Sequence, residues 1–478
     1  MASKVRFKSG STTVTFDGTT DGAVVEYNQK IPDTSYVAVH RATEDGQERP
    51  SMTYRDVDEV VTVMVDGTLS QMKATVRKLN SMLQRARRTQ IDSLNEENEV
   101  FIEVTMSGDS SDWLWRSKIL KVGGGNLEDQ ALDMYLAQGS VVLDIEFTRR
   151  FCWEYTSEVE LGLYNPGQTK ATGGRTVYNC DDGYSSARYG YLDVDNADLV
   201  GDLPAPLRIS MYNSYNDAGR NYEVWVHMNY KQPLTYMNHI MEMEDGTGGT
   251  TQPGAADYAH YSGGYYKNIS WSATSDTVIW YDDMAASFLE ACAGRHFQIM
   301  AKPAGSVSTN IWFKLVLRFG TTPVYQSAWT HVNTSWTATW LSFGVVRLPP
   351  YPIGTTSAYP LELVIYARGS WVGTKTINLD YIKFLPMDRW KNLIYTGGGF
   401  AYTTYLVVDD IENTAYTYGW STAGRIPNYR TIPNGRSLYV TPVPEGSGAQ
   451  RIYFTWRPYD NARTMTVQAW YRPRKLSL

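Results

Sequence analysis

Residues 68–88 limit what this chain can fold into more than any other stretch. Their apolar side chains recur at gaps of three and four residues, which places them on one stripe of an α-helix. The stripe consists of Leu69, Met72, Val76, Leu79, Leu83 and Ala86. Asp66 and Thr68 offer side-chain oxygens to the free amides of the first turn, and arginines crowd the negatively polarised last turn. We therefore expect one amphipathic helix that covers an apolar core.

Four short runs that flank this helix are typical of strands. Residues 60–65 are a β-branched run, too short for a core helix and ended by an Asp-Gly turn. Residues 100–106, 113–124 and 140–151 each alternate apolar with polar residues, as a strand with one buried face does. A further hairpin precedes them, with its turn at Ser9-Gly10-Ser11. The first 155 residues thus predict a sheet built mainly of hairpins, with the helix laid on it.

Composition bounds the class of protein. The chain has 478 residues, enough for two to four domains. Hydrophobic residues make up 42%, charged residues 20%, and the mean hydropathy is -0.37, which together indicate a soluble, folded chain. The 35 Tyr and 15 Trp against 13 Phe are unusual. Tyr and Trp suit sheets, interfaces and sugar-facing surfaces. Most of them are nevertheless expected to be ordinary strand residues without a binding role.

Charge and cysteine usage exclude several classes. A net charge of -6 and a pI near 5.6 argue against a general nucleic-acid binder. The three cysteines, Cys152, Cys180 and Cys292, lie far apart and form no CxxC pair, so neither a disulfide scaffold nor a zinc site is expected. No apolar signal core opens the sequence, and no run reaches the length of a membrane span. We expect synthesis in a cytoplasm and no membrane insertion.

The composition and periodicity of the sequence change near residue 155 and again near 239. Residues 156–238 lack helical periodicity and are rich in Tyr and Gly, and 389–478 return to that style. Between them, a Gly, Thr and Pro linker (EDGTGGTTQPGAAD) leads into a unit with its own alternating strands. These are expected at 269–281, 295–302, 310–319, 339–348, 361–368 and 376–385, with a short helix near 283–292.

The expected fold class is therefore mainly β and multidomain. We assign 1–155 to a first domain, 156–238 plus 389–478 to a discontinuous β-sandwich, and 239–388 to a jelly roll inserted into that sandwich. Three domains in series is the competing interpretation.

Enzyme motifs are missing. The chain has no Walker loop, no HExxH and no GxSxG, and its six histidines are scattered. Paired carboxylates could cleave glycosides, but each doublet sits beside turn residues or at a helix start, where Asp is favoured for local hydrogen bonds. The doublets are Asp181-Asp182, Asp282-Asp283 and Asp409-Asp410. DVDNAD at 193–198 lacks the glycine and glutamate of a calcium loop. We expect no catalytic residue, no metal site and no cofactor.

One group of residues could bind a ligand. On strands 310–319 and 361–368, aromatic and charged residues alternate with the core positions and should share one face. They are Trp312, Lys314, Arg318, Glu362, Tyr366 and Arg368. Flat rings stack on the C–H faces of sugars, and charged groups fix hydroxyls, so a glycan is one candidate ligand. A solvated sheet face and a contact with a neighbouring protein are the alternatives.

Several segments together resemble a known family. A strand-helix-sheet domain closing on SVVLDIEFTRRFCWE is similar to the ring-forming N-terminal domain of distal tail proteins from long-tailed bacteriophages. GDLPAPLRISMYN, GRSLYVTPVPEGSGAQRIYF and TMTVQAWYRPRKLSL resemble the C-terminal sandwich of the same family. TINLDYIKFLP looks like the last strand of a carbohydrate-binding jelly roll, the module that evolved distal tail proteins carry inserted in that sandwich.

The resemblance implies a structural protein of the phage tail, made in the host bacterial cytoplasm and carried in the virion. Its expected form is a homo-hexameric ring between the tail tube protein and the proteins of the tail-tip hub or baseplate. The inserted module could bind host-surface polysaccharide. The family brings no catalytic residues. The alternatives are a tail tube protein with a decoration domain, or a free carbohydrate-binding protein or glycoside hydrolase.

Overall fold

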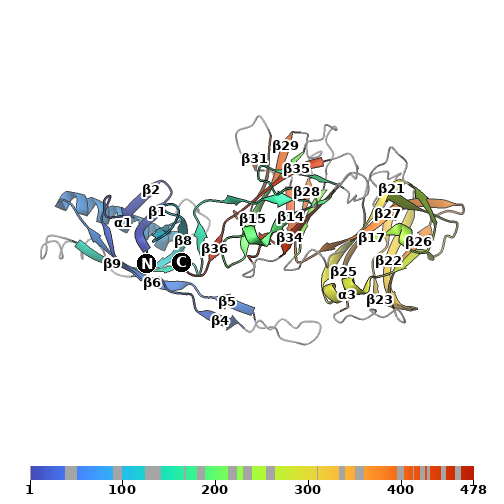
Figure 1. Ribbon diagram of the computed structural model, residues 1–478, viewed down its shortest axis with the longest axis horizontal. Coiled ribbons are helices and arrows are strands. Elements are labelled where there is room, and N and C mark those ends of the chain that lie inside the picture. Colours follow the sequence, from blue (N-terminus) through green and yellow to red (C-terminus); the bar gives the residue numbers. More distant parts are fainter. Residues whose placement is uncertain are drawn as a thin grey trace. The chain divides into compact units, whose positions relative to one another are not determined.

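The structure is a computed structural model, mainly β, in which the described part of the chain has two α-helices, α1 (Leu69–Thr89) and α3 (Ala286–Cys292) (Figure 1). The residues described are 2–37, 51–89, 99–123, 141–165, 168–179, 189–213, 223–229, 240–253, 264–308, 310–332, 340–349, 360–395, 403–412, 414–419, 426–427, 431–442, 448–457 and 464–478. Contacts divide the chain into two compact units. Unit 1 holds residues 1–159, 200–203 and 472–478, and unit 2 holds 160–199 and 204–471.

Unit 1 is an antiparallel sheet with one long helix. Its strands follow the order β2-β1-β7-β8-β9-β6-β3, and β10 and β36 extend it beside β8. The bounds are β1 Ala2–Ser9, β2 Thr12–Phe16, β3 Ala23–Tyr27, β6 Val57–Val65, β7 Phe101–Met106, β8 Trp115–Val122, β9 Val141–Arg149, β10 Trp153–Tyr155 and β36 Arg474–Lys475. A separate hairpin joins β4 (Thr34–Val37) and β5 (Ser51–Tyr54). The predicted hairpin, strands and helix of this region are confirmed.

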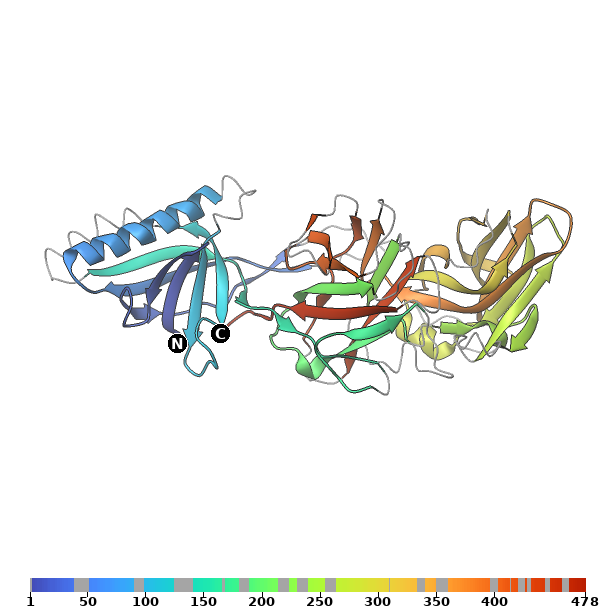
Figure 2. The same cartoon turned by 90° about the horizontal axis from the view of Figure 1, so that it is seen from above.

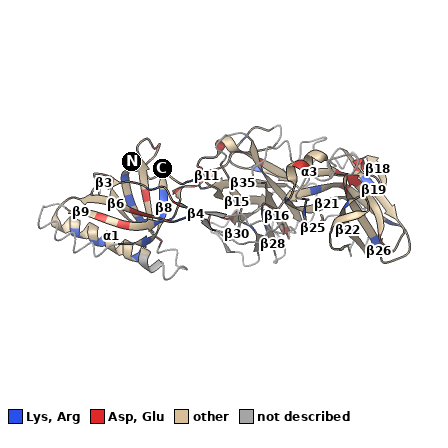
Figure 3. Ribbon diagram, turned by 90° about the horizontal axis from the view of Figure 1, so that it is seen from below, with Lys and Arg blue, Asp and Glu red and all other residues tan. Residues whose placement is uncertain are grey.

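Helix α1 lies along one face of this sheet, against β8, β1 and β2 (Figure 2). All six stripe positions except the half-buried Leu69 are buried, and so is Met82, which the spacing argument omitted. Thr68 and Gln71 cap each other: the Gln71 side-chain oxygen accepts from the Thr68 amide at 2.9 Å, and the Thr68 hydroxyl oxygen accepts from the Gln71 amide at 3.4 Å. Lys and Arg mark the outer side of α1 (Figure 3). Neither described helix is long and apolar enough to cross a bilayer.

Unit 2 contains two sheets that we call the split sheets, because their strands come from both sides of residues 240–386. One runs β11-β35-β15-β29-β30-β31, with β13 on β35 and β33 on β15, and the other runs β12-β14-β34-β16-β28-β32. The bounds are β11 Val159–Glu160, β12 Leu163–Tyr164, β13 Arg175–Tyr178, β14 Tyr191–Asp195, β15 Ala205–Asn213, β16 Glu223–Met228, β28 Arg389–Tyr395, β29 Thr404–Asp409, β30 Thr414–Gly419, β31 Ile426–Pro427, β32 Thr431–Gly435, β33 Tyr439–Val440, β34 Ala449–Arg457 and β35 Thr464–Tyr471.

The same unit contains two further antiparallel sheets, which we call the central sandwich because one apolar core lies between them. The first runs β18-β19-β27-β21-β25 with β17 on β27, and the second runs β20-β26-β22-β23 with β24 on β22. The bounds are β17 Ile240–Glu242, β18 Thr250–Pro253, β19 Tyr265–Trp271, β20 Thr277–Asp283, β21 His296–Val307, β22 Ile311–Phe319, β23 Thr322–Gln326, β24 Thr330–Val332, β25 Leu341–Arg347, β26 Leu361–Gly369 and β27 Lys375–Pro386.

Two expectations for this region are wrong. The single strand expected at 269–281 is two strands in different sheets, β19 and β20. Ser275 and Asp276 lie in the connection, where such polar residues favour a turn over continued pairing. The expected Gly, Thr and Pro linker contains β18, which pairs with β19. Pro253 is tolerated there because β18 is an edge strand.

The split sheets and the central sandwich meet at a buried junction inside unit 2. Aromatic and apolar residues from both form one cluster: Tyr191, Trp225, Met300, Trp340, Tyr381, Leu385 and Tyr453. The Trp340 indole N–H donates to the Asn179 side-chain oxygen at 3.1 Å. His227 is fully buried, and its Nδ1 lies 3.1 Å from the carbonyl oxygen of Pro386. The strands on either side of residues 240–386, β16 and β28, pair directly, with Met228 opposite Arg389.

Candidate functional site

The pairing of β22 with β26 brings together all six residues expected to form the recognition site. In this antiparallel register Trp312 lies opposite Arg368, Lys314 opposite Tyr366, and Arg318 opposite Glu362. Side chains on one strand alternate between faces, so these three pairs share the face that points away from the core. Their core-side neighbours, such as Phe313 and Leu363, are fully buried. We call this surface the aromatic face.

Charges on the aromatic face are paired with one another and with rings. Arg318 Nε lies 2.6 Å from a Glu362 carboxylate oxygen. The Lys314 ammonium lies 5.1 Å from the centre of the Tyr366 ring. The Arg368 guanidinium lies 5.7 Å from the centre of the Trp312 ring. Burial opposes the charge of Arg318, but its bond to Glu362 outweighs that cost and raises the pKa of the guanidinium.

Four further residues belong to this face, and the sequence argument missed them: Tyr281, Asp276, Trp329 and His331. Trp329 makes a cation–π contact with each of two cations. The centre of its ring lies 4.9 Å from the Lys314 ammonium and 4.4 Å from the Arg368 guanidinium. Asp276 lies 3.7 Å from Lys314 and 3.9 Å from Arg368. The Arg318 guanidinium is 5.9 Å from the Tyr281 ring. These residues come from short or edge segments, which carry no alternation long enough to reveal a face.

One face of the Trp312 ring is covered by another ring. Trp312 stacks on the His331 ring, with the centroids 4.4 Å apart and the planes 14° from parallel. Val316 and Val364, on the same side of the two strands, are buried. The face is therefore a packed layer of rings and charges. A ligand would meet ring edges and charged ends over much of it.

The other acidic motifs have structural partners. Asp409 accepts hydrogen bonds from the amides of Ile411 and Glu412, as a turn residue does. Within DVDNAD, Asp193 binds the Arg451 guanidinium at 2.8 Å, and Lys170 bridges to two carboxylates of that motif. Cys152 and Cys292 are buried free thiols. Asp181, Asp182 and Cys180 lie outside the described residues.

Metal binding has no support in the part of the chain that the structure describes, because no three His, Cys, Asp or Glu side chains are grouped to hold an ion. The remaining doublet, Asp282-Asp283, lies at the end of β20 and lines a cavity at the edge of the central sandwich.

Comparisons with known proteins give only remote likenesses. No protein-family model matches the chain, and no curated protein matches it. Among solved structures, the Dit protein of phage SPP1, described as a paradigm of the hub adsorption apparatus in phages that infect Gram-positive bacteria, is 8% identical over 98% of both chains, with a TM-score of 0.30. A chain of the activated phage P2 baseplate with Ca is 8% identical over 96% of this chain and 100% of that one, with a TM-score of 0.22.

A capsid structure is also similar. The VP2 subviral particle of infectious bursal disease virus is 8% identical over 67% of this chain and 82% of its own, with a TM-score of 0.17. TM-scores and identities this low identify neither a family nor a function for the chain.

Proposed function

We propose that this chain is a structural component of a bacteriophage tail, a distal tail protein that forms a hexameric ring between the tail tube and the tail tip. The order of its parts supports this proposal. A helix-covered antiparallel sheet comes first, paired strands on both sides of the central sandwich follow, and residues 472–478 return to unit 1. This is the order that the resemblance of the sequence to that family implies.

The observation that carries the ring is the open sheet of unit 1. Among the described residues, its outermost strands β2 and β3 each pair on one side only. An unpaired strand edge is a template for pairing with another chain, and a head-to-tail contact of this kind closes into a ring when its rotation allows. Val25 on β3 is 55% exposed beside this edge.

We further propose that residues 239–388 are an inserted domain. The strands before and after this segment, β16 and β28, are neighbours along their whole length, so the sheet would remain continuous without it. The central sandwich also has a core cluster drawn only from residues 243–384.

Electron microscopy of the purified full chain tests the assembly directly. We expect six-fold rings and a mass by light scattering of six chains. A monomer at all concentrations would favour a free carbohydrate-binding protein, and stacked open tubes would favour a tail tube protein.

A variant at the β3 edge tests whether this edge forms the contact between subunits of the ring. Val25→Asp places a charge at the β3 edge and should convert rings to monomers at an unchanged melting temperature. Val60→Asp is the matched control, because Val60 is similarly exposed at 43% but lies on β6, which is paired on both sides. Rings that survive Val25→Asp would remove this edge as the contact.

For the aromatic face we propose adhesion to host-surface polysaccharide. Its support is the convergence of five rings and three cations on one sheet face, since aromatic and arginine side chains are enriched where surfaces bind. Trp329 and Tyr366 are half-buried and lie around Lys314.

Titration of the full chain against cell-wall polysaccharides and a glycan array tests this second function. Trp312→Ala should weaken binding on the order of thirtyfold, the equivalent of about 2 kcal/mol at a central anchor. A chain that binds no glycan, but whose assembly with other tail proteins depends on Trp312, would make the face a protein contact instead.

A further inference from the structure

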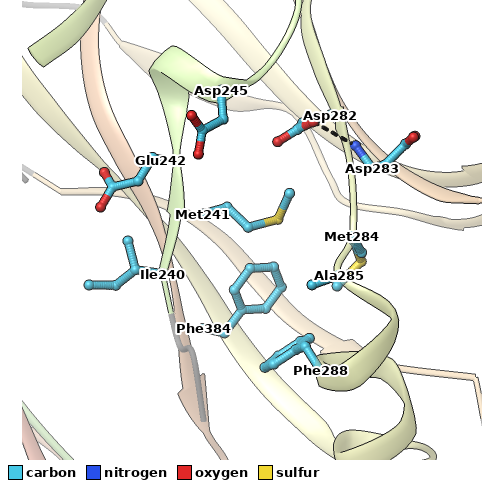
Figure 4. Close-up of a pocket in the computed structure, with 10 residues that line it drawn as sticks. All are labelled: Ile240, Met241, Glu242, Asp245, Asp282, Asp283, Met284, Ala285, Phe288 and Phe384. Carbon is cyan, nitrogen blue, oxygen red and sulfur yellow. Dashed lines mark hydrogen bonds between the residues drawn. The ribbon is translucent and has the colours of Figure 1, made fainter. Parts of the chain in front are cut away.

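We propose that the cavity at the edge of the central sandwich binds a primary alkylammonium group, a cation on an apolar stem. This site is separate from the aromatic face and does not depend on assembly into a tail. It is formed where β17 and the turn after it lie opposite the end of β20 and the start of α3 (Figure 4).

The cavity has an apolar floor and an acidic mouth. Its volume is about 200 Å³, below the roughly 300–1,000 Å³ of sites that enclose drug-sized ligands, so it suits a single side-chain-sized group. Figure 4 shows the carboxylates of Asp245 and Asp282 at one end and the rings of Phe384 and Phe288 at the other, with Met241 between them. The full lining is Ile240, Met241, Glu242, Asp245, Asp282, Asp283, Met284, Ala285, Phe288 and Phe384.

The acidic mouth favours a cation. Burial and the negative charges of Asp245 and Asp283 raise the pKa of Asp282, against the Asp283 amide and the charge of Lys267, which lower it. Burial and the charge of Glu362 likewise raise the pKa of Asp283. A positive charge placed among these groups would relieve their repulsion, whereas an anion would add to it.

The floor selects among cations. A metal ion needs several oxygen ligands converging on one point, and no group of three carboxylates in the described residues provides this. Methionine side chains and aromatic rings instead offer dispersion contacts to a chain of methylene groups. The charged end and the stem of an alkylammonium match the two ends of the cavity. Methionine also adapts its shape to a guest because its side chain is unbranched and flexible.

The experiment uses the full chain with ¹³C-methyl-labelled methionine and n-hexylammonium as the probe. The methyl signals of Met241 and Met284 should shift on titration and saturate, and n-hexanol should bind at least tenfold more weakly. N-acetyl-lysine methylamide and glucosamine then distinguish the sources: the first stands for a lysine of a protein partner, the second for an amino sugar. Equal binding of n-hexanol, or no shift at saturating probe, would overturn the proposal.

Charge-neutral variants locate the site. Asp282→Asn keeps the oxygen that accepts from the Asp283 amide at 2.9 Å, so the strand end stays intact, and binding should fall about tenfold. Asp245→Asn, at an exposed position, should act in the same direction and serves if the first variant misfolds. Glu290→Gln is the control, because Glu290 is exposed on α3 and does not line the cavity. A loss of equal size in Glu290→Gln would show that only general charge matters.

Discussion

The apolar stripe of α1 and the aromatic face of the central sandwich both follow from simple periodicities, yet they stabilise the molecule in different ways. On α1 the members of the stripe are removed from water almost completely, and Leu79 is fully buried. On the aromatic face, half-buried rings and cations contact one another, and each such contact is worth roughly 0.5–1 kcal/mol. The stripe therefore secures a core, while the face can be altered with little loss of stability.

Leu79→Ala should have the largest effect. Loss of a fully buried leucine side chain leaves a cavity, so the free energy of unfolding should fall by on the order of 2–5 kcal/mol. Hydrogen exchange across unit 1 and its thermal transition measure this. Lys73→Ala, on the exposed side of the same helix, is the control and should change stability by less than about 0.5 kcal/mol. Equal melting of parent and Leu79→Ala would mean that the stripe faces no core.

At the junction in unit 2, His227 is fully buried like Leu79 of the α1 stripe, but it can gain a charge. Burial, together with the nearby charge of Lys383, lowers the pKa of His227 to about 4. The unfolded chain therefore binds a proton below a pH of about 6.5 while the folded chain does not. Stability should fall as pH drops from 6.5 towards 4, by up to about 3 kcal/mol.

Thermal unfolding of unit 2 between pH 7 and pH 4 measures this loss. His227→Gln, which keeps a side-chain donor, should flatten the pH dependence over that window. Parent and His227→Gln curves that run parallel between pH 7 and pH 4 would contradict a neutral, buried His227.

Trp312→Ala tests the other side of the comparison. Because the ring stacks on His331 and lies beside Arg368 on the outer face, its loss should cost about 1 kcal/mol, against the roughly 3–5 kcal/mol typical of a core aromatic residue. Phe313→Ala, one residue along on the fully buried side of β22, supplies the contrast in the same assay. If the two variants melt alike, the aromatic face is part of the core.

The smallest effect is expected at Glu244, beside the acidic cavity, because this side chain is only half-buried and water screens its charge. Burial, together with the charges of Asp380 and Asp245, raises its pKa to about 7. The folded state then binds the extra proton between a pH of about 4.5 and 7, so the contribution of Glu244 to stability should decline as pH rises through that window. Glu244→Gln should remove the decline and leave the transition slightly higher at pH 8. His227 acts in the opposite direction over part of this window, so the test is the difference in stability between parent and variant. Parent and Glu244→Gln curves that run parallel from pH 4.5 to pH 8 would contradict the raised pKa.

Much of the fold follows from the sequence because long elements repeat their pattern several times. The α1 stripe and strands such as β22 and β26 show enough alternation to fix which face is buried, and the register then unites the six predicted residues. Short edge strands do not show enough alternation to fix which face is buried. Trp329 and His331 lie on or beside β24, whose three residues carry no periodicity. The acidic cavity escaped prediction for another reason. Asp245 and Asp282 are far apart in sequence, and only the folding of β17 and β20 onto one core brings them together.

The pairing of β16 with β28 has a mechanical consequence. Both ends of the central sandwich leave the split sheets at one point, where Met228 faces Arg389. A pulling force on the sandwich would open hydrogen bonds there one after another, as a zipper opens, instead of shearing them all at once. Arg389 resists this at the first pair, since its buried guanidinium donates to the Tyr439 carbonyl and, at 2.7 Å, to the Thr441 hydroxyl. Once the junction cluster between the two parts has separated, such a pull loads one small, reinforced spot and leaves the rest of the sheet unstrained.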